Sequence, residues 1–201
     1  MFVTFEGIEG CGKSTQAKLL YEWLKENGHK VLLTREPGGT KAAEEIRELI
    51  LKHREETFPP FAELCLYTAA RAFHVENLIR PSLEKGFIVV CDRFSDSTVA
   101  YQGYGRGLSL ELINSMNREA TKGLEPDITF LLDVPVEVGL LRIKSKVKDR
   151  IEEESLRFHQ KVREGFLRIA EENPERVVVI DGTKDIGTIF SQVLNHVVRR
   201  L

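Results

Sequence analysis

The sequence predicts a single α/β domain built on a five-stranded parallel sheet flanked by helices. Short apolar runs recur along the chain and alternate with longer stretches of helical periodicity. The runs are continuously apolar, as expected of parallel strands that are buried on both faces. No Gly/Ser-rich or Pro-rich linker divides the 201 residues, a length that suits one well-buried core. We therefore expect one domain over residues 1–201.

The expected elements follow from these runs. Strands are predicted at residues 2–5, 31–33, 87–91, 128–132 and 177–180. Helices are predicted at residues 15–27, 41–52, 61–84, 110–121, 136–146, 152–172 and 186–199. Ligands of open α/β sheets bind at the carboxyl ends of the strands, so residues that directly follow a strand are the first candidates for a site.

Composition narrows the class of protein. Charged residues make up 30% and hydrophobic residues 42%, with a net charge of −2, which argues against disorder and against a nucleic-acid partner. The N-terminus lacks the order of a secretory signal, and no apolar run approaches the length of a membrane span. We expect a cytoplasmic protein without a membrane partner. The three cysteines have no metal-binding spacing.

A glycine-rich phosphate loop at residues 7–14 is the strongest local signal. Its sequence GIEGCGKS has the Gly-x4-Gly-Lys-Ser spacing between a predicted strand and a predicted helix. Glycines let backbone N–H groups curl around a phosphate, Lys13 reaches the outer phosphates, and the hydroxyl of Ser14 can bind Mg²⁺. The predicted nucleotide-phosphate residues are Gly7, Gly10, Cys11, Gly12, Lys13, Ser14 and Thr15.

Two other strand ends carry candidate site residues. Asp92 and Arg93 follow the third strand, where a carboxylate can organise Mg²⁺ and an arginine can clamp phosphate oxygens in a fork. An aspartate at this position can also be a simple helix cap. Residues 35–39, which include Glu36 and Pro37, form either an ordinary turn or a loop that shapes a substrate pocket, with a possible cis Glu36–Pro37 bond.

Several segments of the sequence resemble the motifs of a known family. Residues 92–103, DRFSDSTVAYQG, resemble the signature of thymidylate kinases, and REPGG at residues 35–39 resembles the second-strand loop of the bacterial members. Residues 66–71, 126–127, 132–134 and 149–152 are similar to further family segments, in family order from residue 2 to about residue 183. The resemblance implies a P-loop nucleoside monophosphate kinase fold that transfers the γ-phosphoryl group of ATP to dTMP, giving dTDP and ADP with Mg²⁺, in a homodimer.

The resemblance also implies roles on the donor side. Lys13 and the loop amides would hold the ATP phosphates, Ser14 and Asp92 the metal, and Arg93 would lie between the donor and acceptor phosphates. Arg142 would flank the adenine, with the other wall formed by Gly182, Thr183 and Lys184.

For the acceptor, the resemblance implies a region at about residues 35–106. Tyr67 would stack on thymine and Arg71 would donate to its O4; because arginine only donates, this arrangement disfavours cytosine. Without the resemblance, Tyr67 reads as a core aromatic and Arg71 as a surface ion pair. The remaining implied dTMP contacts are Glu9 at the 3′-OH, Tyr101 near C2′, Ser97 and Thr98 at the base edge, Glu36, Pro37 and Gln102. Gln102 and Arg106 are expected in a glycine-rich loop.

A basic lid is implied at about residues 142–151. Residues 8–11 of the phosphate loop carry no basic side chain, so in this family the lid must supply the catalytic cation. The lid has Lys144, Lys146 and Lys148 where similar bacterial lids are arginine-rich, and lysine lacks a bidentate fork. Arg150 is therefore the predicted catalytic cation.

Two alternatives stay open from the sequence. Another P-loop kinase, acting on a deoxynucleoside or a different monophosphate, would share the phosphate loop and lid. An NTP-binding switch without kinase activity could use the same loop, although the guanine-reading Asn-Lys-x-Asp motif is absent from the sequence.

Overall fold

A five-stranded, all-parallel sheet forms the centre of the protein, as predicted. The computed structural model describes residues 1–53, 55, 56, 58–144 and 149–201. The strand order is β2-β3-β1-β4-β5. The strands are β1 (Phe2–Glu6), β2 (Val31–Arg35), β3 (Ile88–Asp92), β4 (Ile128–Asp133) and β5 (Val177–Asp181). Each strand ends one or two residues beyond its predicted apolar run, on a charged residue, because the ladder continues to the polar edge of the sheet.

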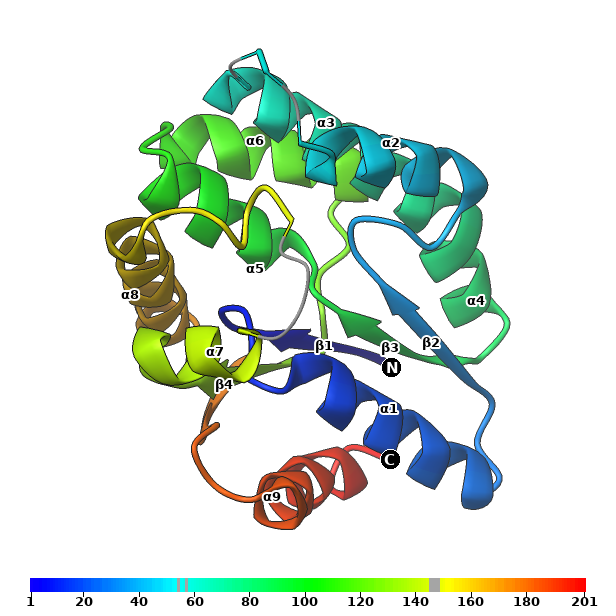
Figure 1. Cartoon of the computed structure of the whole chain (residues 1–201). Helices are drawn as coiled ribbons and strands as arrows, with labels where there is room; N and C mark the ends of the chain where they lie inside the picture. The colour runs from blue at the N-terminus through cyan, green and yellow to red at the C-terminus, as the bar shows by residue number, and fades with distance from the viewer. Residues whose placement is uncertain (54, 57, 145–148) are drawn as a thin grey trace.

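Helices lie on both sides of this sheet (Figure 1). The longer ones are α1 (Lys13–Glu26), α2 (Lys41–Leu51), α3 (Pro60–His74), α6 (Leu110–Thr121), α8 (Leu156–Glu172) and α9 (Ile186–Val198). The shorter ones are α4 (Arg80–Glu84), α5 (Ser95–Thr98), α7 (Val136–Arg142) and the π-helical segments η1 (Val75–Ile79) and η2 (Val99–Gly105). None of the helices within the described ranges is long and apolar enough to cross a membrane.

The two faces of the sheet are covered by different helices. In Figure 1, α1 and α9 lie on one side, and α2, α3, α5 and α6 lie on the other. Buried side chains of β1 and β4, such as Phe5 and Phe130, form the larger apolar core with α1, α8 and α9. Phe2 belongs to a smaller core with η1 and β3. The sheet thereby fixes the positions of the loops at its carboxyl edge.

Three predicted helix boundaries differ from the structure by two or more residues. The helix predicted to begin at residue 152 begins at Leu156, where the hydroxyl of Ser155 accepts a hydrogen bond from the backbone N–H of Phe158. The helix predicted over residues 136–146 is helical to Arg142, and residues 145 and 146 lie outside the described ranges. The first helix begins earlier than predicted, at Lys13 inside the glycine motif.

The glycine-rich loop predicted around Gln102 is instead helical. Gln102 lies in η2, and Arg106 caps its end. Gly105 permits close packing: a Cβ added there would lie 2.8 Å from the Phe158 ring and 3.0 Å from Val162 of α8. Gly105 therefore allows η2 to pack closely against α8, and its presence does not indicate a loop.

Candidate active site

A cavity of about 770 Å³ opens at the carboxyl edge of the sheet. Its walls come from the phosphate loop, the ends of β2 and β3, helix α3, the η2 segment and the loop after β5. The predicted residues that line it are Glu9, Gly10, Cys11, Gly12, Lys13, Ser14, Thr15, Glu36, Pro37, Tyr67, Arg71, Asp92, Arg93, Ser97, Thr98, Tyr101, Gln102, Arg142, Gly182 and Lys184. The structure therefore brings most of the predicted site residues to one space.

The phosphate loop requires its glycines. Gly10 has a φ of 72°, and a Cβ added there would lie 2.1 Å from the carbonyl oxygen of Gly139. A Cβ on Gly7, at a φ of 135°, would lie 2.6 Å from the carbonyl oxygen of Leu132. The loop is thus pressed against β4 and α7, a packing that only glycine permits.

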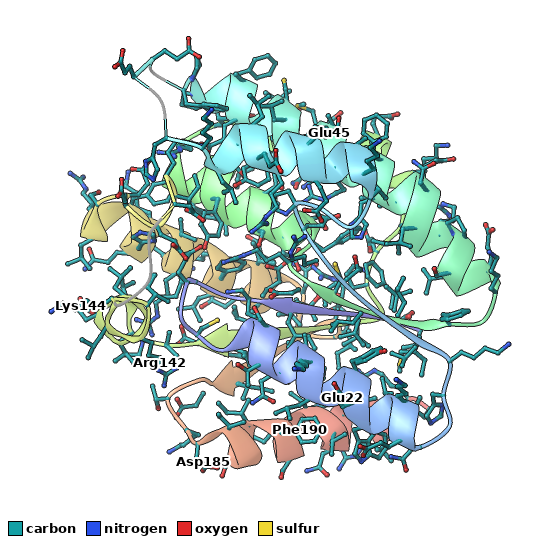
Figure 2. The ribbon with its side chains drawn as sticks, turned by 45° about the vertical axis from the view of Figure 1, so that its right-hand side comes forward. Glu22, Glu45, Arg142, Lys144, Asp185 and Phe190 are labelled. Carbon is teal, nitrogen blue, oxygen red and sulfur yellow. The ribbon has the colours of Figure 1, made fainter. Side chains whose placement is uncertain are left out.

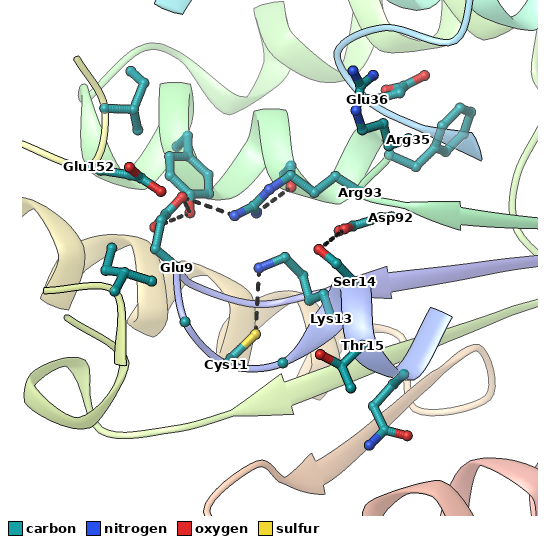
Figure 3. A pocket seen from close by; sticks show the side chains of 18 of the residues that line it. Glu9, Cys11, Lys13, Ser14, Thr15, Arg35, Glu36, Asp92, Arg93 and Glu152 are labelled. Atoms are coloured by element: carbon teal, nitrogen blue, oxygen red, sulfur yellow. Dashed lines mark hydrogen bonds and ion pairs between the residues drawn. The ribbon is translucent and has the colours of Figure 1, made fainter. Parts of the chain in front are cut away.

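Lys13 lies folded into the loop that it follows. Its Nζ donates to the carbonyl oxygens of Gly7, at 3.0 Å, and Ile8, at 2.8 Å, and lies 3.5 Å from the sulfur of Cys11 (Figure 3). The ammonium group is therefore held at the centre of the curled backbone, where a bound phosphate would meet it.

Ser14 and Asp92 place two oxygen ligands side by side. Ser14 lies in the first turn of helix α1, and its hydroxyl donates to Oδ2 of Asp92, the last residue of β3 (Figure 3). The described residues contain no cluster of three or more His, Cys, Asp or Glu side chains suited to a metal. Mg²⁺ commonly binds through one or two protein oxygens together with substrate phosphates and water, so this pair fits that ion.

Arg93 joins the phosphate loop to the opposite wall. Its backbone has a φ of 74°, which turns the chain sharply after β3. Nη1 donates to the carbonyl oxygen of Gly7 at 2.9 Å and to the hydroxyl of Ser97 at 3.2 Å, and Nη2 donates to Glu9 at 2.9 Å (Figure 3). The guanidinium also lies over the ring of Tyr101, 5.1 Å from its centroid. It therefore stands between the two halves of the cavity.

Glu9 is an ionised carboxylate at the same junction. The hydroxyl of Tyr101 contacts both of its oxygens, at 2.6 and 2.7 Å. Burial alone would raise the pKa of Glu9, but the charges of Arg93 and Lys13 and the hydrogen bond from Tyr101 outweigh it and hold that pKa below its usual value. The carboxylate therefore keeps its charge at neutral pH.

Arg71 is buried, which rules out the surface ion pair that the sequence left open. Its side chain is 1% exposed. Nε donates to Glu36 at 2.8 Å, Nη1 to Thr98 at 2.8 Å and Asn117 at 2.7 Å, and Nη2 to the carbonyl oxygen of Phe94 at 3.0 Å. The bonds to described residues use four of the five N–H groups of an arginine. The guanidinium plane is thus fixed in one orientation.

Tyr67 lies one helical turn before Arg71 and is half-buried beside the cavity. Burial, with a smaller contribution from the charge of Glu63, raises the pKa of its hydroxyl, so the ring is neutral at physiological pH. The spacing of four residues puts both side chains on one face of α3, as the sequence predicts.

The loop after β2 is held by a buried histidine that the sequence did not single out. The Glu36–Pro37 bond is cis. The second oxygen of Glu36 lies 3.0 Å from Nδ1 of His74, and Nε2 of that ring lies 2.7 Å from the hydroxyl of Thr34. His74 therefore orients the carboxylate that in turn holds Arg71.

Arg142 connects the phosphate loop to the loop after β5. Its Nη1 donates to the carbonyl oxygens of Gly182, at 3.0 Å, and Gly10, at 3.3 Å. Lys184 also lines the cavity, whereas the hydroxyl of Thr183 donates to Asp181 and Thr183 is not among the lining residues. Of the residues predicted to border the adenine, Arg142, Gly182 and Lys184 therefore line the cavity and Thr183 does not.

The side chain of Arg150 binds partners outside the phosphate loop. Its Nη2 donates to Glu63 at 2.5 Å, and its Nε donates to the carbonyl oxygen of Ile50 at 3.1 Å. It is not among the cavity-lining residues. Of the lid lysines, Lys144 is exposed beside Arg142 at the end of α7 (Figure 2), and Lys146 and Lys148 lie outside the described residues.

Comparison with known proteins identifies the family. The family model described as thymidylate kinase matches residues 5–193. The chain belongs to the thymidylate kinase family. It is similar to the thymidylate kinases of Sulfurihydrogenibium sp. (strain YO3AOP1) and Geotalea daltonii, each 51% identical, over 99% and 100% of this chain and 97% of each relative. A crystal structure of thymidylate kinase from Ehrlichia chaffeensis is 39% identical over 98% of both chains, with a TM-score of 0.80.

The family assignment and the P-loop nucleoside monophosphate kinase fold predicted from the sequence are thus confirmed. Several supporting residues were missed by sequence reasoning. Glu63 is fully buried and binds both Arg106 and Arg150, and its position four residues before Tyr67 was an available signal. Asn117 carried no comparable local signal, because it reaches the site from α6, whereas His74, three residues after Arg71 on α3, carried the same helical-spacing signal.

Proposed function

We infer that this member of the thymidylate kinase family transfers the γ-phosphoryl group of ATP to dTMP, giving dTDP and ADP. The observation that best supports this function is one continuous cavity that runs from the phosphate loop to the Tyr67 and Arg71 face of α3, with Arg93 between them. Phosphoryl transfer needs two phosphates aligned and their charge neutralised, and little covalent chemistry from the protein.

On the donor side, we propose that the loop amides and Lys13 hold the β- and γ-phosphates. Ser14 and Asp92 would hold Mg²⁺, which supplies positive charge to the transferring phosphoryl group when bound. Arg142, with Gly182 and Lys184, would border the adenine. Arg93 is already fixed by Gly7 and Glu9, so it can contact both phosphates without a large rearrangement.

On the acceptor side, we propose that Tyr67 stacks on the thymine and that Arg71 donates to its O4. The remaining roles follow from position: Glu9 would accept from the 3′-OH, Tyr101 would border C2′, and Thr98 and Ser97 would lie at the base edge. The rigid hold on Arg71 supports this arrangement, since a donor that cannot turn away distinguishes a carbonyl from an amino group.

The lid arginine requires a change of partner. For Arg150 to stabilise the transferring phosphoryl group, its guanidinium must leave Glu63 and reach the phosphates. An Arg150→Lys variant, which keeps the charge and loses the fork, is expected to lower kcat far more than it raises KM for dTMP. Unchanged kcat in this variant would move the role to the lid lysines.

The function is tested by a panel of acceptors. The protein is incubated with Mg-ATP and, separately, dTMP, dUMP, dCMP, dGMP, AMP and thymidine, and ADP formation is followed. We expect the fastest turnover with dTMP. Turnover of dCMP, AMP or thymidine without dTMP would indicate a different kinase, and nucleotide binding without turnover of any acceptor would indicate a switch.

We further propose a homodimer and a cytoplasmic location. Exposed apolar side chains on α3 and α6, among them Phe61, Phe73, Leu110 and Leu112, support a second copy of the chain as the partner. Sedimentation velocity measures the assembly: a single species of monomer mass at micromolar concentration would contradict it.

A further inference from the structure

Glu63 is a buried carboxylate that the roles above do not use. It lies on α3, four residues before Tyr67 and eight before Arg71, so it shares their helix face. Its side chain is 0% exposed. Burying an ionised carboxylate costs free energy unless the charge is paired and its oxygens accept hydrogen bonds.

Its two oxygens are fully engaged. Oε1 accepts from Nε2 of Gln102 at 2.9 Å and from Nε of Arg106 at 3.0 Å. Oε2 accepts from Nη2 of Arg106 at 3.2 Å and from Nη2 of Arg150 at 2.5 Å. These bonds use the usual accepting capacity of a carboxylate. Burial alone would raise the pKa of Glu63, but the hydrogen bonds and charge of Arg106, with Gln102 and Arg150, hold it below its usual value.

An ionised carboxylate dictates how a neighbouring amide is turned. It accepts hydrogen bonds and has none to donate, so only the NH₂ end of Gln102 can face Glu63. A rotated amide would place its oxygen against a carboxylate oxygen at hydrogen-bond distance, which is repulsive. Gln102 and Arg71 both line the cavity. Its oxygen is therefore the amide atom turned away from Glu63.

We propose that Glu63 is a positioning residue for acceptor specificity: by holding Nε2 of Gln102, it keeps the amide oxygen of that residue available to the N–H of an imide base. This inference rests on the proposed function. Thymine carries a hydrogen on N3, whereas cytosine has a lone pair there. A fixed acceptor at Gln102 binds the first and repels the second, in addition to the discrimination by Arg71.

The Glu63→Gln variant tests the turn of the amide. A glutamine at this position can accept from Nη2 of Arg106 and Nη2 of Arg150 through its oxygen and donate to Gln102 through its NH₂ group, which leaves only Nε of Arg106 without its present acceptor. The amide of Gln102 then rotates and offers N–H to the ligand, which suits cytosine. We expect the ratio of kcat/KM for dTMP to that for dCMP to fall about tenfold or more.

This ratio separates specificity from stability. Both substrates are measured on one preparation, so a loss of folded protein cancels, as does a change in kcat caused by releasing Arg150. The matched control is Glu154→Gln, which removes the other carboxylate on Arg106, 2.5 Å from its Nη1, and leaves Glu63 in place. Its ratio is expected to stay within about twofold of the wild-type value.

A double-mutant cycle identifies the route. In a Gln102→Ala background, Glu63→Gln should cause no further fall in the ratio. An unchanged ratio in Glu63→Gln, or an equal fall with and without Gln102, would overturn the inference. If Glu63→Gln gives no folded protein, Gln102→Ala alone takes its place: the inference requires the dTMP/dCMP ratio to fall when this amide is removed, and an unchanged ratio overturns it. Wild-type protein that fails to phosphorylate dTMP would instead defeat the proposed function.

Discussion

Replacing Glu6 by glutamine should change how stability depends on pH. Glu6 ends β1 directly before the phosphate loop and is 1% exposed. Its oxygens accept from the backbone N–H of Phe94 at 2.7 Å and from the hydroxyl of Ser97 at 2.6 Å. Burial, followed by the charge of Asp96, raises its pKa from 4.5 to about 7, against the opposing effects of Arg93 and the two hydrogen bonds.

The direction of the effect follows from the raised pKa. Below pH 4.5 the carboxyl is protonated in both states and costs nothing. As the pH rises toward 7, the unfolded chain releases its proton while the folded protein keeps it, so the free energy of unfolding falls. A rise from 4.5 to about 7 corresponds to about 3 kcal/mol of lost stability once Glu6 is ionised in both states.

The Glu6→Gln variant has no such loss, because its amide is neutral at every pH. The amide can still accept from Phe94, and it can donate to Ser97, whose hydroxyl also accepts. Relative to wild type, the variant should gain about 3 kcal/mol between about pH 4.5 and about pH 8, or about 6 to 12 °C in Tm.

Thermal unfolding at several pH values measures this difference. The control is Glu22→Gln, which makes the same charge change on the exposed face of α1 (Figure 2). Its Tm difference from wild type should not grow with pH. A Glu6→Gln difference that is flat, or that shrinks as the pH rises, would show that the buried carboxyl is not the source of the pH dependence.

Three further predictions concern the loop and the two arginines. Gly10→Ala should raise the Kd for ATP at least about tenfold, because the added Cβ meets the carbonyl oxygen of Gly139. The control is Gly86→Ala, at a similar positive φ but with no atom within 4 Å of the added Cβ. Equal effects of the two variants in a nucleotide titration would refute the packing argument. Arg93→Lys should lower kcat at least about tenfold with a smaller change in KM, since lysine cannot hold Gly7, Ser97 and Glu9 together; steady-state kinetics with KM as the main change would contradict this. Arg71→Met should lower the free energy of unfolding by about 3 to 5 kcal/mol, because it leaves the buried charge of Glu36 without its partner. Arg35→Met, which breaks the exposed pair with Glu44, should lower it by less than about 1 kcal/mol. Similar denaturant midpoints for the two variants would exclude the buried pair as the cause.

The sequence by itself determined the fold class and predicted which residues of the phosphate loop line the cavity. The phosphate loop could be predicted because its chemistry is local: eight consecutive residues fix both the backbone path and the side chains that face a phosphate. The spacing of Tyr67 and Arg71 is local as well, since one helix sets it. Asp92 followed from its position at a strand end, because parallel strands bring their carboxyl ends to one edge.

Only the tertiary structure decided how these groups are held. Arg71 takes its orientation from Glu36, Thr98 and Asn117, which lie 35, 27 and 46 residues away along the chain. Arg150 lies 87 residues from Glu63, and its ion pair there could not be read from the basic stretch around it. Such contacts depend on how α3, η2 and the loop before α8 pack. Local periodicity determines on which face of a helix a side chain lies, whereas tertiary packing determines which residue that side chain contacts.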